Sequence, residues 1–365
     1  MKYMDEFRNR DIVKGLAAQI AALASRLSEP VTFMEVCGTH TMSIYQYGIR
    51  SLLPPQVRLI SGPGCPVCVT PIGYVDKAVA YARRPDTIVA TFGDMLRVPG
   101  STSSLMQERA RGADIRIVYS TLDALALAEK NPGKMVIFLG VGFETTAPTI
   151  AGSILAAASR GVTNYFVLSA HKTIPVPMQV LSSDSELGID GYICPAHVSA
   201  IIGADAYRFL AEEHRVQCVA TGFEPADVMH GIWMLVRQIV EKRSEVEIQY
   251  SRFVTWEGNR KARALLAEVF TPAATAWRGI GTIPQSGLEI AAKYAAFDAE
   301  KAVPVEVEDP LEPQGCLCGE VLKGKVAPCD CPLFGKDCTP ETPVGACMVS
   351  SEGSCAAAYK YGQGF

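Results

Sequence analysis

The sequence predicts an α/β protein with two similar parallel-sheet domains, followed by a cysteine-rich C-terminal domain with helices. Short apolar runs alternate with helical patterns from about residue 57 to 245. Nearly all-apolar strands separated by helices are typical of parallel sheets, which are covered on both faces. Seven of the twelve cysteines lie in the last 50 residues, which indicates a C-terminal unit with different chemistry. At 365 residues the chain exceeds one ordinary core, so two or three domains are expected.

The expected elements follow from apolar runs and from apolar residues at helical spacing. The predicted strands are Val31–Val36, Val57–Ser61, Thr87–Thr91, Ile115–Tyr119, Met135–Gly140, Tyr165–Ser169, Gly191–Ile193 and Gln217–Thr221. The predicted helices are Ile12–Leu27, Gly73–Ala82, Thr121–Glu129, Thr146–Ala158, Val198–Glu213, Arg260–Val269 and Gly287–Ala299. The segments Gly142-Phe143-Glu144 and Gly222-Phe223-Glu224 each follow a strand, a short echo that supports two similar units.

These elements divide the chain into four predicted parts. Residues 1–55 form an N-terminal helix and a strand that leads into a loop with Cys37, and residues 56–150 form the first α/β domain. Residues 151–245 form the second α/β domain, and residues 246–365 form a helical and cysteine-rich domain. The cysteine-rich tail has few large apolar residues, so metal ligation would have to supply folding free energy there.

Composition and charge exclude several classes of protein. Hydrophobic residues make up 48% and charged residues 20%, as in an ordinary folded protein. A net charge of −4 leaves no basic footprint for nucleic acid. No apolar run approaches the roughly 20 residues that cross a membrane, and no apolar stretch follows the charged N-terminus as in an export signal. We therefore expect a cytoplasmic protein, in which clustered thiols bind metal or do redox chemistry rather than form structural disulfides.

The first candidate site is Cys37, which directly follows the predicted strand Val31–Val36 and precedes a predicted turn and helix. Gly38 permits a tight turn at this point. A thiol at a helix N-terminus has a lowered pKa and can serve as a thiolate ligand or a nucleophile. His40 is close enough in sequence to exchange a hydrogen bond with the thiol. The alternative is a small buried cysteine in a strand-to-helix turn.

The second candidate site is the pair Cys65 and Cys68, which follows the predicted strand Val57–Ser61 in the sequence SGPGCPVC. A CxxC segment with an internal proline holds two sulfur atoms within reach of a disulfide or a shared metal. The pair is therefore a redox dithiol or half of a metal site. Half of a structural zinc site is the alternative.

The third candidate site is the array of cysteines in the tail, which suggests a site with four thiolates. One set is Cys318, Cys331, Cys338 and Cys355, with Cys316 as an alternate for Cys318. The spacing matches neither a short ferredoxin repeat nor a paired-CxxC zinc ribbon. A [4Fe–4S] cluster and zinc both accept four thiolates, so both stay open at this point. No histidine lies beyond residue 230, which excludes a Cys/His zinc finger in the tail.

Polar side chains after other strands form a further set of candidates, because sites in parallel sheets collect in the loops past the carboxyl ends of strands. These candidates are Asp94, Glu144, Thr145, Thr146, His171, His197 and Glu224. The loop from Gly140 to Pro148 does not satisfy the GxGxxG pattern of dinucleotide sites. A single histidine at a strand end is more often a hydrogen-bonded structural residue than a functional one.

Together these segments resemble the HypD family. The matching stretches are MEVCGTHT (34–41), SGPGCPVCVTP (61–71), TFGDMLRVPGS (91–101), GVGFETTAP (140–148), ICPAHVS (193–199), TGFEP (221–225) and the cysteine tail from Gly315 to Tyr361. They run over most of the chain in a consistent order, and the cysteine motifs show no departure from the family pattern. Cys329 is an extra thiol that leaves the cluster assignment open.

The resemblance implies a role in building the Fe(CN)2CO unit of [NiFe]-hydrogenases. It implies two α/β domains and a C-terminal domain that carries a [4Fe–4S] cluster. It also implies that Cys37 binds iron at a central cleft, beside His40, with Cys65 and Cys68 nearby as redox thiols or iron ligands. HypD-like proteins pair with a small HypC-type chaperone, and a HypE-type protein supplies cyanide.

Two other functions remain open from the sequence. The first is an iron–sulfur disulfide oxidoreductase, which would use the CxxC pair and the cluster but would need neither Cys37 nor a HypC-type partner. The second is a non-catalytic interaction protein whose tail binds zinc through four thiolates.

Overall fold

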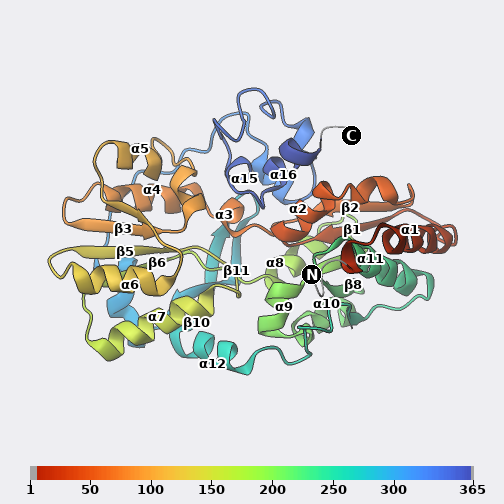
Figure 1. Ribbon diagram of the computed structural model, residues 1–365, viewed down its shortest axis with the longest axis horizontal. Coiled ribbons are helices and arrows are strands. Elements are labelled where there is room, and N and C mark those ends of the chain that lie inside the picture. The colour runs from red at the N-terminus through yellow and green to blue at the C-terminus, as the bar shows by residue number, and fades with distance from the viewer. Residues whose placement is uncertain (1–5, 363–365) are drawn as a thin grey trace.

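The chain folds around two parallel β-sheets and one antiparallel hairpin (Figure 1). This computed structural model describes residues 6–362. Residues 1–5, part of the segment expected not to be an export signal, lie outside the described range. The predicted α/β fold with parallel sheets is confirmed.

The first sheet joins strands from both halves of the chain. Its order is β2 (Val57–Ser61), β1 (Val31–Glu35), β7 (Gly191–Pro195), β8 (Gln217–Thr221) and β9 (Val246–Ile248). All of its pairings are parallel, so the carboxyl ends of its strands lie at one edge. Glu35 pairs with Ser61 at this edge, and the loops that carry Cys37 and Cys65 therefore begin side by side.

The second sheet is formed by consecutive segments of the chain. Its order is β4 (Ile115–Ile117), β3 (Thr87–Thr91), β5 (Met135–Gly140) and β6 (Tyr165–Ser169), again all parallel. All of β3 and all but the first residue of β5 are buried, which explains why these segments are apolar along their whole length.

Each of the two sheets contains strands from both of the predicted domain ranges, 56–150 and 151–245. β2 lies in the first range but belongs to the sheet of β7 and β8, whereas β6 lies in the second range but pairs with β5. The chain leaves the first sheet after β2, builds the second sheet and then returns. Helical crossovers permit such a path, and strand spacing along the sequence does not reveal it.

Helices cover both sheets. α1 (Arg10–Ala24) packs with α11 (Pro225–Val240) against the first sheet and shares a hydrophobic core with it. α4 (Ile72–Ala82), α6 (Thr121–Lys130) and α7 (Ala147–Arg160) pack against the second sheet. The other α-helices are α2 (Gly38–Gln46), α3 (Pro66–Val69), α5 (Leu105–Ala110), α8 (Pro175–Ser182), α9 (Ala196–Ile202), α10 (Arg208–Glu212), α12 (Arg260–Val269), α13 (Ala299–Ala302), α14 (Cys318–Leu322), α15 (Ala346–Val349) and α16 (Ser354–Tyr361). The 3₁₀ turns are η1 (Glu6–Arg8), η2 (Ile49–Leu52), η3 (Gly93–Arg97), η4 (Ala204–Tyr207), η5 (Ala292–Phe297) and η6 (Pro328–Asp330).

Two predicted helices differ from the structure. The helix predicted over Gly287–Ala299 is wrong, because its first residues belong to a hairpin of β10 (Phe270–Trp277) and β11 (Gly281–Ile290). The helix predicted over Val198–Glu213 breaks at Gly203, whose φ of +88° ends α9. A side chain at Gly203 would also collide with the carbonyl of Trp256, which lies 2.1 Å from an ideal Cβ position.

The tail from residue 315 holds only short helices and lies over the junction between the two sheets (Figure 1). α16 packs against α2, which follows Cys37, and α15 packs against α3, which carries the CxxC pair. The cysteine-rich tail therefore contacts both of the thiol segments that the sequence singles out near the N-terminus.

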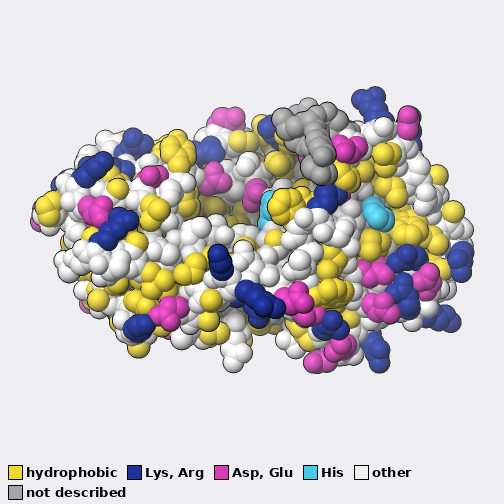
Figure 2. Space-filling view, turned by 60° about the horizontal axis from the view of Figure 1, so that its bottom comes forward, with side chains coloured by type: hydrophobic (Ala, Val, Ile, Leu, Met, Phe, Trp, Pro, Cys, Tyr) yellow, Lys and Arg dark blue, Asp and Glu magenta, His cyan; other side chains and the backbone are white. Residues whose placement is uncertain are grey.

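The surface drawn in Figure 2 mixes acidic and basic side chains. Over residues 6–362, the helices are all too short or too polar to cross a lipid bilayer.

Candidate functional site

The turn that carries Cys37 lies directly against the turn that carries Cys65. The N–H of Gly38 donates a hydrogen bond to the carbonyl of Gly64 at 2.9 Å. An ideal Cβ on Gly64 would lie 2.1 Å from the amide nitrogen of Cys37, so only glycine permits this approach. The predicted proximity of Cys37 to the CxxC segment is therefore present at the level of the backbone.

The tail covers the Cys37 turn from a second side. The Thr39 hydroxyl donates to Oε1 of Glu352 at 2.8 Å. An ideal Cβ on Gly38 would lie 2.5 Å from the Cβ of Glu352 and 2.6 Å from its carbonyl oxygen, so the tail packs closely against this glycine. Three segments that are far apart in the sequence thus meet around Cys37.

The expected lowering of the Cys37 pKa is wrong. Burial and the nearby Glu352 carboxylate raise the pKa of this thiol to about 11. Cys37 does precede the first residue of α2, and the backbone N–H groups of Thr39 and His40 favour its thiolate. Their effect is smaller than that of burial, so the metal-free thiol is protonated at neutral pH.

His40 contacts the Cys37 turn through its backbone, whereas its ring points to β8. Nε2 lies 3.0 Å from the carbonyl oxygens of both Thr221 and Gly222, so it must carry the proton. Burial lowers the pKa of His40 to about 4, which makes the ring neutral. Nδ1 is buried and has no hydrogen-bond partner among the described residues.

Glu35 is a buried carboxyl that joins β1, β2 and α2. Its Oε1 accepts hydrogen bonds from the hydroxyls of Ser61 and, at 3.1 Å, of Thr41. Arg50 lies 4.0 Å away as a partly exposed counter-charge. Burial raises the pKa of Glu35 despite these partners. The network fixes the strand ends from which both thiol turns start.

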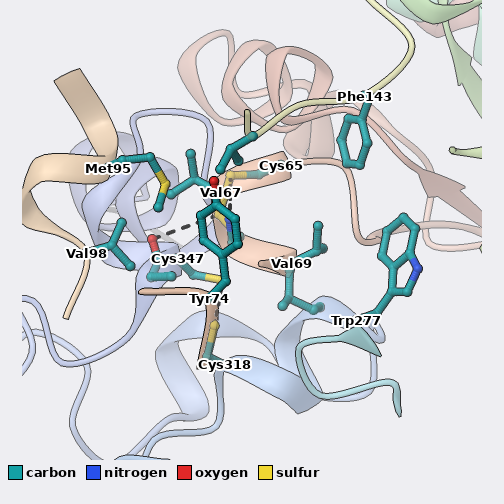
Figure 3. Packing of buried hydrophobic residues seen from close by; sticks show 14 of the residues in the cluster. Cys65, Val67, Val69, Tyr74, Met95, Val98, Phe143, Trp277, Cys318 and Cys347 are labelled. Atoms are coloured by element: carbon teal, nitrogen blue, oxygen red, sulfur yellow. Dashed lines mark hydrogen bonds between the residues drawn. A yellow bond between two sulfur atoms is a disulfide. The ribbon is translucent and has the colours of Figure 1, made fainter. Parts of the chain in front are cut away.

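Cys65 and Cys68 form a disulfide inside the protein. Cys65 precedes the first residue of α3, and its sulfur accepts from the N–H of Cys68 at 3.2 Å. The Cys68 sulfur lies 3.9 Å from the carbonyl of Ala346 in the tail. Ala346 directly precedes Cys347, so this contact is made by the neighbour of a tail thiol in the sequence. Figure 3 shows Cys65, Cys347 and Cys318 within one packed cluster.

The tail thiols surround a single small cavity. The cysteines that line it are Cys316, Cys318, Cys331, Cys338, Cys347 and Cys355. The sulfur atoms of Cys318 and Cys347 lie 2.8 Å apart. Because the thiols of Cys316 and Cys347 hydrogen-bond to Cys318, the pKa of Cys318 is lowered, and the nearby Arg278 adds to this effect.

The four thiols of the predicted set line one cavity together with Cys347, which the predicted set does not include. Cys316 and Cys318 both line the cavity, so the lining does not separate the two alternates. Cys329 is exposed and faces a different pocket, beside Arg50 and Arg58. The extra thiol noted in the sequence therefore stands apart from the tail site.

The donor chemistry of the tail fits a four-iron cluster. Such a cluster takes four cysteine thiolates, and six thiols line this cavity. Within residues 6–362, no three His, Cys, Asp or Glu side chains are arranged to hold a single metal ion. Four cysteine thiolates are also the ligand set of a structural zinc ion, so the donor types by themselves fit either group.

Asp94 and its neighbour Arg97 attach the second sheet to the tail. The Ser350 hydroxyl donates to Oδ2 of Asp94 at 3.0 Å. The guanidinium of Arg97 donates to the carbonyls of Val349 and Pro340 at 3.1 and 3.2 Å. These contacts hold the tail loop that begins just before Glu352.

His197 and Glu224 lie on the side of His40. The ring of Phe223 lies between two histidines, with ring centroids 4.1 Å from His197 and 4.6 Å from His40. Glu224 follows in sequence and accepts a hydrogen bond from Arg8 at 2.9 Å. Glu224 is therefore an ion-pair partner of the N-terminal segment.

Glu144 lines a separate cavity of about 700 Å³ that also includes Arg260, Arg263 and Phe270. Its Oε1 accepts from the N–H of Ile174 at 2.9 Å, and its Oε2 is buried without a partner among the described residues. Burial raises the pKa of Glu144 to about 7. None of the cysteines described above lines this cavity.

The remaining cleft candidates have local partners. Thr145 is exposed, and the hydroxyl of Thr146 donates to the carbonyl of Phe143 at 3.2 Å. His171 is buried, with Nδ1 2.9 Å from the hydroxyl of Ser169. Burial lowers the pKa of His171 to about 3. In the described part of the chain, no hydrogen bond or ring contact links these three side chains to the Cys37 turn.

Three residues of the site carry no clear sequence signal. Glu352 sits in a short polar segment, and Arg278 lies in a turn between the predicted helices Arg260–Val269 and Gly287–Ala299. Cys347 could have been included by counting all seven tail cysteines as donors. Their importance comes from contacts between distant segments, which spacing in the sequence does not report.

Fold and site together define a thiol-rich α/β protein whose candidate chemistry depends on sulfur from three distant segments. The family model HypD, described as "Hydrogenase formation hypA family", matches residues 11–362. The chain is 49% identical over 371 residues to the hydrogenase maturation factor HypD of Rhizobium leguminosarum bv. viciae, covering 100% of this chain and 96% of that protein.

Two further relatives agree. The chain is 48% identical to the hydrogenase maturation factor HypD of Rhodobacter capsulatus, with 99% of this chain and 98% of that protein covered. It is 45% identical to the protein of that name in Escherichia coli (strain K12), with 100% and 99% covered. The chain therefore belongs to the HypD family.

Proposed function

We propose that this chain acts in [NiFe]-hydrogenase maturation as a scaffold on which the Fe(CN)2CO unit is assembled together with a HypC-type chaperone. Membership of the HypD family and the names of its relatives support hydrogenase maturation. The observation that carries the scaffold role is the meeting of three segments at Cys37: Gly38 bonds to Gly64, and Thr39 bonds to Glu352.

Cys37 is the proposed ligand of the iron that is being assembled. Electron-rich iron with cyanide and carbonyl ligands favours a soft thiolate donor. A single protein thiolate leaves positions free for the diatomic ligands and for a thiolate from the partner. Because the pKa of Cys37 is about 11, iron binding must displace a proton from this thiol. The N-terminus of α2 suits the negative charge of bound cyanide, for which a HypE-type protein is the proposed donor.

The tail thiols are the proposed ligands of a resident [4Fe–4S] cluster, with Cys318, Cys331, Cys338 and Cys355 as the first choice and Cys316 or Cys347 as alternates. When bound, such a cluster accepts and donates single electrons. Conversion of the Cys65–Cys68 disulfide to two thiols takes two electrons and two protons. The contact of Cys68 with Ala346 supports the tail as the route by which these electrons arrive.

The test is anaerobic co-purification with a HypC-type partner, followed by infrared spectroscopy. We expect bands in the cyanide and carbonyl stretching region for the wild-type protein. Cys37→Ala removes the proposed iron ligand and should abolish these bands. Cys329→Ala removes an exposed thiol outside the site and should leave them in place. Bands that persist in Cys37→Ala would contradict the scaffold role.

The same variant separates the proposal from a plain iron–sulfur disulfide oxidoreductase. Such an enzyme would need the Cys65–Cys68 disulfide, and its turnover would survive Cys37→Ala. Metal analysis separates the proposal from a zinc-binding interaction protein. A brown protein that bleaches with dithionite supports the cluster, and a colourless protein with one zinc contradicts it.

A further inference from the structure

Arg278 lies in the turn of the β10–β11 hairpin and is tied to the end of α3. Its N–H donates to the carbonyl of Val69 at 2.9 Å, and its Nε donates to the carbonyl of Thr70 at 3.0 Å. α3 also carries Cys68, one residue before Val69. The side chain is 3% exposed, so the hairpin inserts a buried guanidinium beside the CxxC segment.

The same turn touches the start of the tail site. Gly279 has a φ of +76°, and an ideal Cβ on it would lie 2.1 Å from the Cα of Gly319. Gly319 directly follows Cys318, which lines the thiol cavity. Arg278 therefore lies between the disulfide segment and the tail thiols.

The positive charge of Arg278 is poorly compensated by the rest of the protein. Its one ion-pair partner among the described residues is Glu312, at 3.4 Å from Nη1, and that side chain is 60% exposed. Such exposed partners contribute little. Nη2 is buried and has no hydrogen-bond partner among the described residues. Burying a guanidinium with so few partners lowers the stability of the fold unless another negative group lies nearby.

We propose that Arg278 is the counter-charge of the tail thiolate site and sets the potential at which that site is reduced. The inference rests on the proposed function, in which the tail holds a [4Fe–4S] cluster. A low-potential one-electron donor adds one electron and hence one negative charge to the site, and no bond forms or breaks. A fixed positive charge nearby stabilises the reduced state, which raises the reduction potential. Arg278 acts through the thiolate site and is a positioning residue.

The test is the midpoint potential of the cluster in the full-length protein, measured by mediator titration of its visible absorbance. Removing the charge in Arg278→Gln should make reduction roughly tenfold less favourable, which is about 59 mV for a one-electron couple. Arg278→Lys retains the charge and should shift the potential less. Arg260→Gln removes an exposed arginine that faces a different cavity and should leave the potential unchanged.

A second variant keeps the inference testable if Arg278→Gln does not fold. Glu312→Gln leaves Arg278 in place and removes its exposed partner, so it should shift the potential upwards, by less than Arg278→Gln lowers it because the Glu312 charge is screened by solvent. Potentials of Arg278→Gln and Glu312→Gln that equal that of Arg260→Gln would overturn the inference while leaving the proposed function intact. If the purified wild-type protein contains neither iron nor sulfide, both the proposed cluster and this inference are contradicted.

Discussion

Replacing Gly64 with alanine tests whether the Cys37 and Cys65 turns must touch. The new Cβ would lie 2.1 Å from the amide nitrogen of Cys37 and 2.4 Å from its Cα. Both are backbone atoms and cannot rotate away, so the turns must separate by about 1 Å to restore ordinary contact. Separation breaks the hydrogen bond from Gly38 to Gly64, which contributes about 1 kcal/mol. Overpacking adds about 1–3 kcal/mol, so we expect a total loss of about 2–4 kcal/mol.

The assay is urea unfolding of Gly64→Ala beside Gly93→Ala. Gly93 is a matched control, because a Cβ there meets no atom within 4 Å. Alanine at this position should be neutral or slightly stabilising. A second readout is the rate of Cys37 alkylation by iodoacetamide, which should rise as the turns separate. Equal stability of the two variants, with unchanged alkylation, would refute the close approach.

Three further predictions concern the charges and thiols around the site. Glu352→Gln removes a carboxylate that raises the pKa of Cys37, so alkylation of metal-free protein at pH 8 should become roughly threefold faster; an unchanged rate would contradict this. Burial raises the pKa of Glu144 from an ordinary 4.5 to about 7, so the fold holds a proton that the unfolded chain releases, and this contribution to stability is lost as pH rises through that window. From pH 4.5 to 7.5, the free energy of unfolding of Glu144→Gln should therefore rise by about 3 kcal/mol relative to that of the wild type, as measured by urea unfolding. A difference between the two proteins that does not change with pH would contradict this. Cys331→Ala should lose most of the bound iron in metal analysis, whereas Cys329→Ala, two residues away but exposed, should keep it; equal iron contents would exclude the tail site.

The strands were predictable because burial on both faces leaves an apolar run that can be read directly. β3, β5 and β8 begin and end where the sequence predicts. The hairpin was missed because β11 combines proline, glycine and isolated apolar residues, a pattern without a clear period of two or 3.6. Sheet membership was missed because pairing between distant strands leaves no mark on local spacing.

The thiol segments were predictable from residue types at strand ends, but their electrostatics were not. The sequence places Cys37 at a helix N-terminus, and this is confirmed. It does not reveal that Glu352 folds back onto the same turn or that the turn is covered by the tail. Burial outweighs the helix terminus, so the pKa of Cys37 rises where the local pattern predicts a fall. Packing between distant segments therefore determines the direction in which the pKa of Cys37 shifts.

The central claim is that the tail thiols and the CxxC pair act as one redox unit whose segments contact the Cys37 turn. The most direct measurement is anaerobic reduction with methyl viologen radical, a one-electron donor, followed by alkylation mapped by mass spectrometry. The account predicts that Cys65 and Cys68 become alkylated together in iron-loaded wild-type protein and stay joined in Cys331→Ala under the same conditions. A disulfide that opens equally fast in both proteins would contradict it.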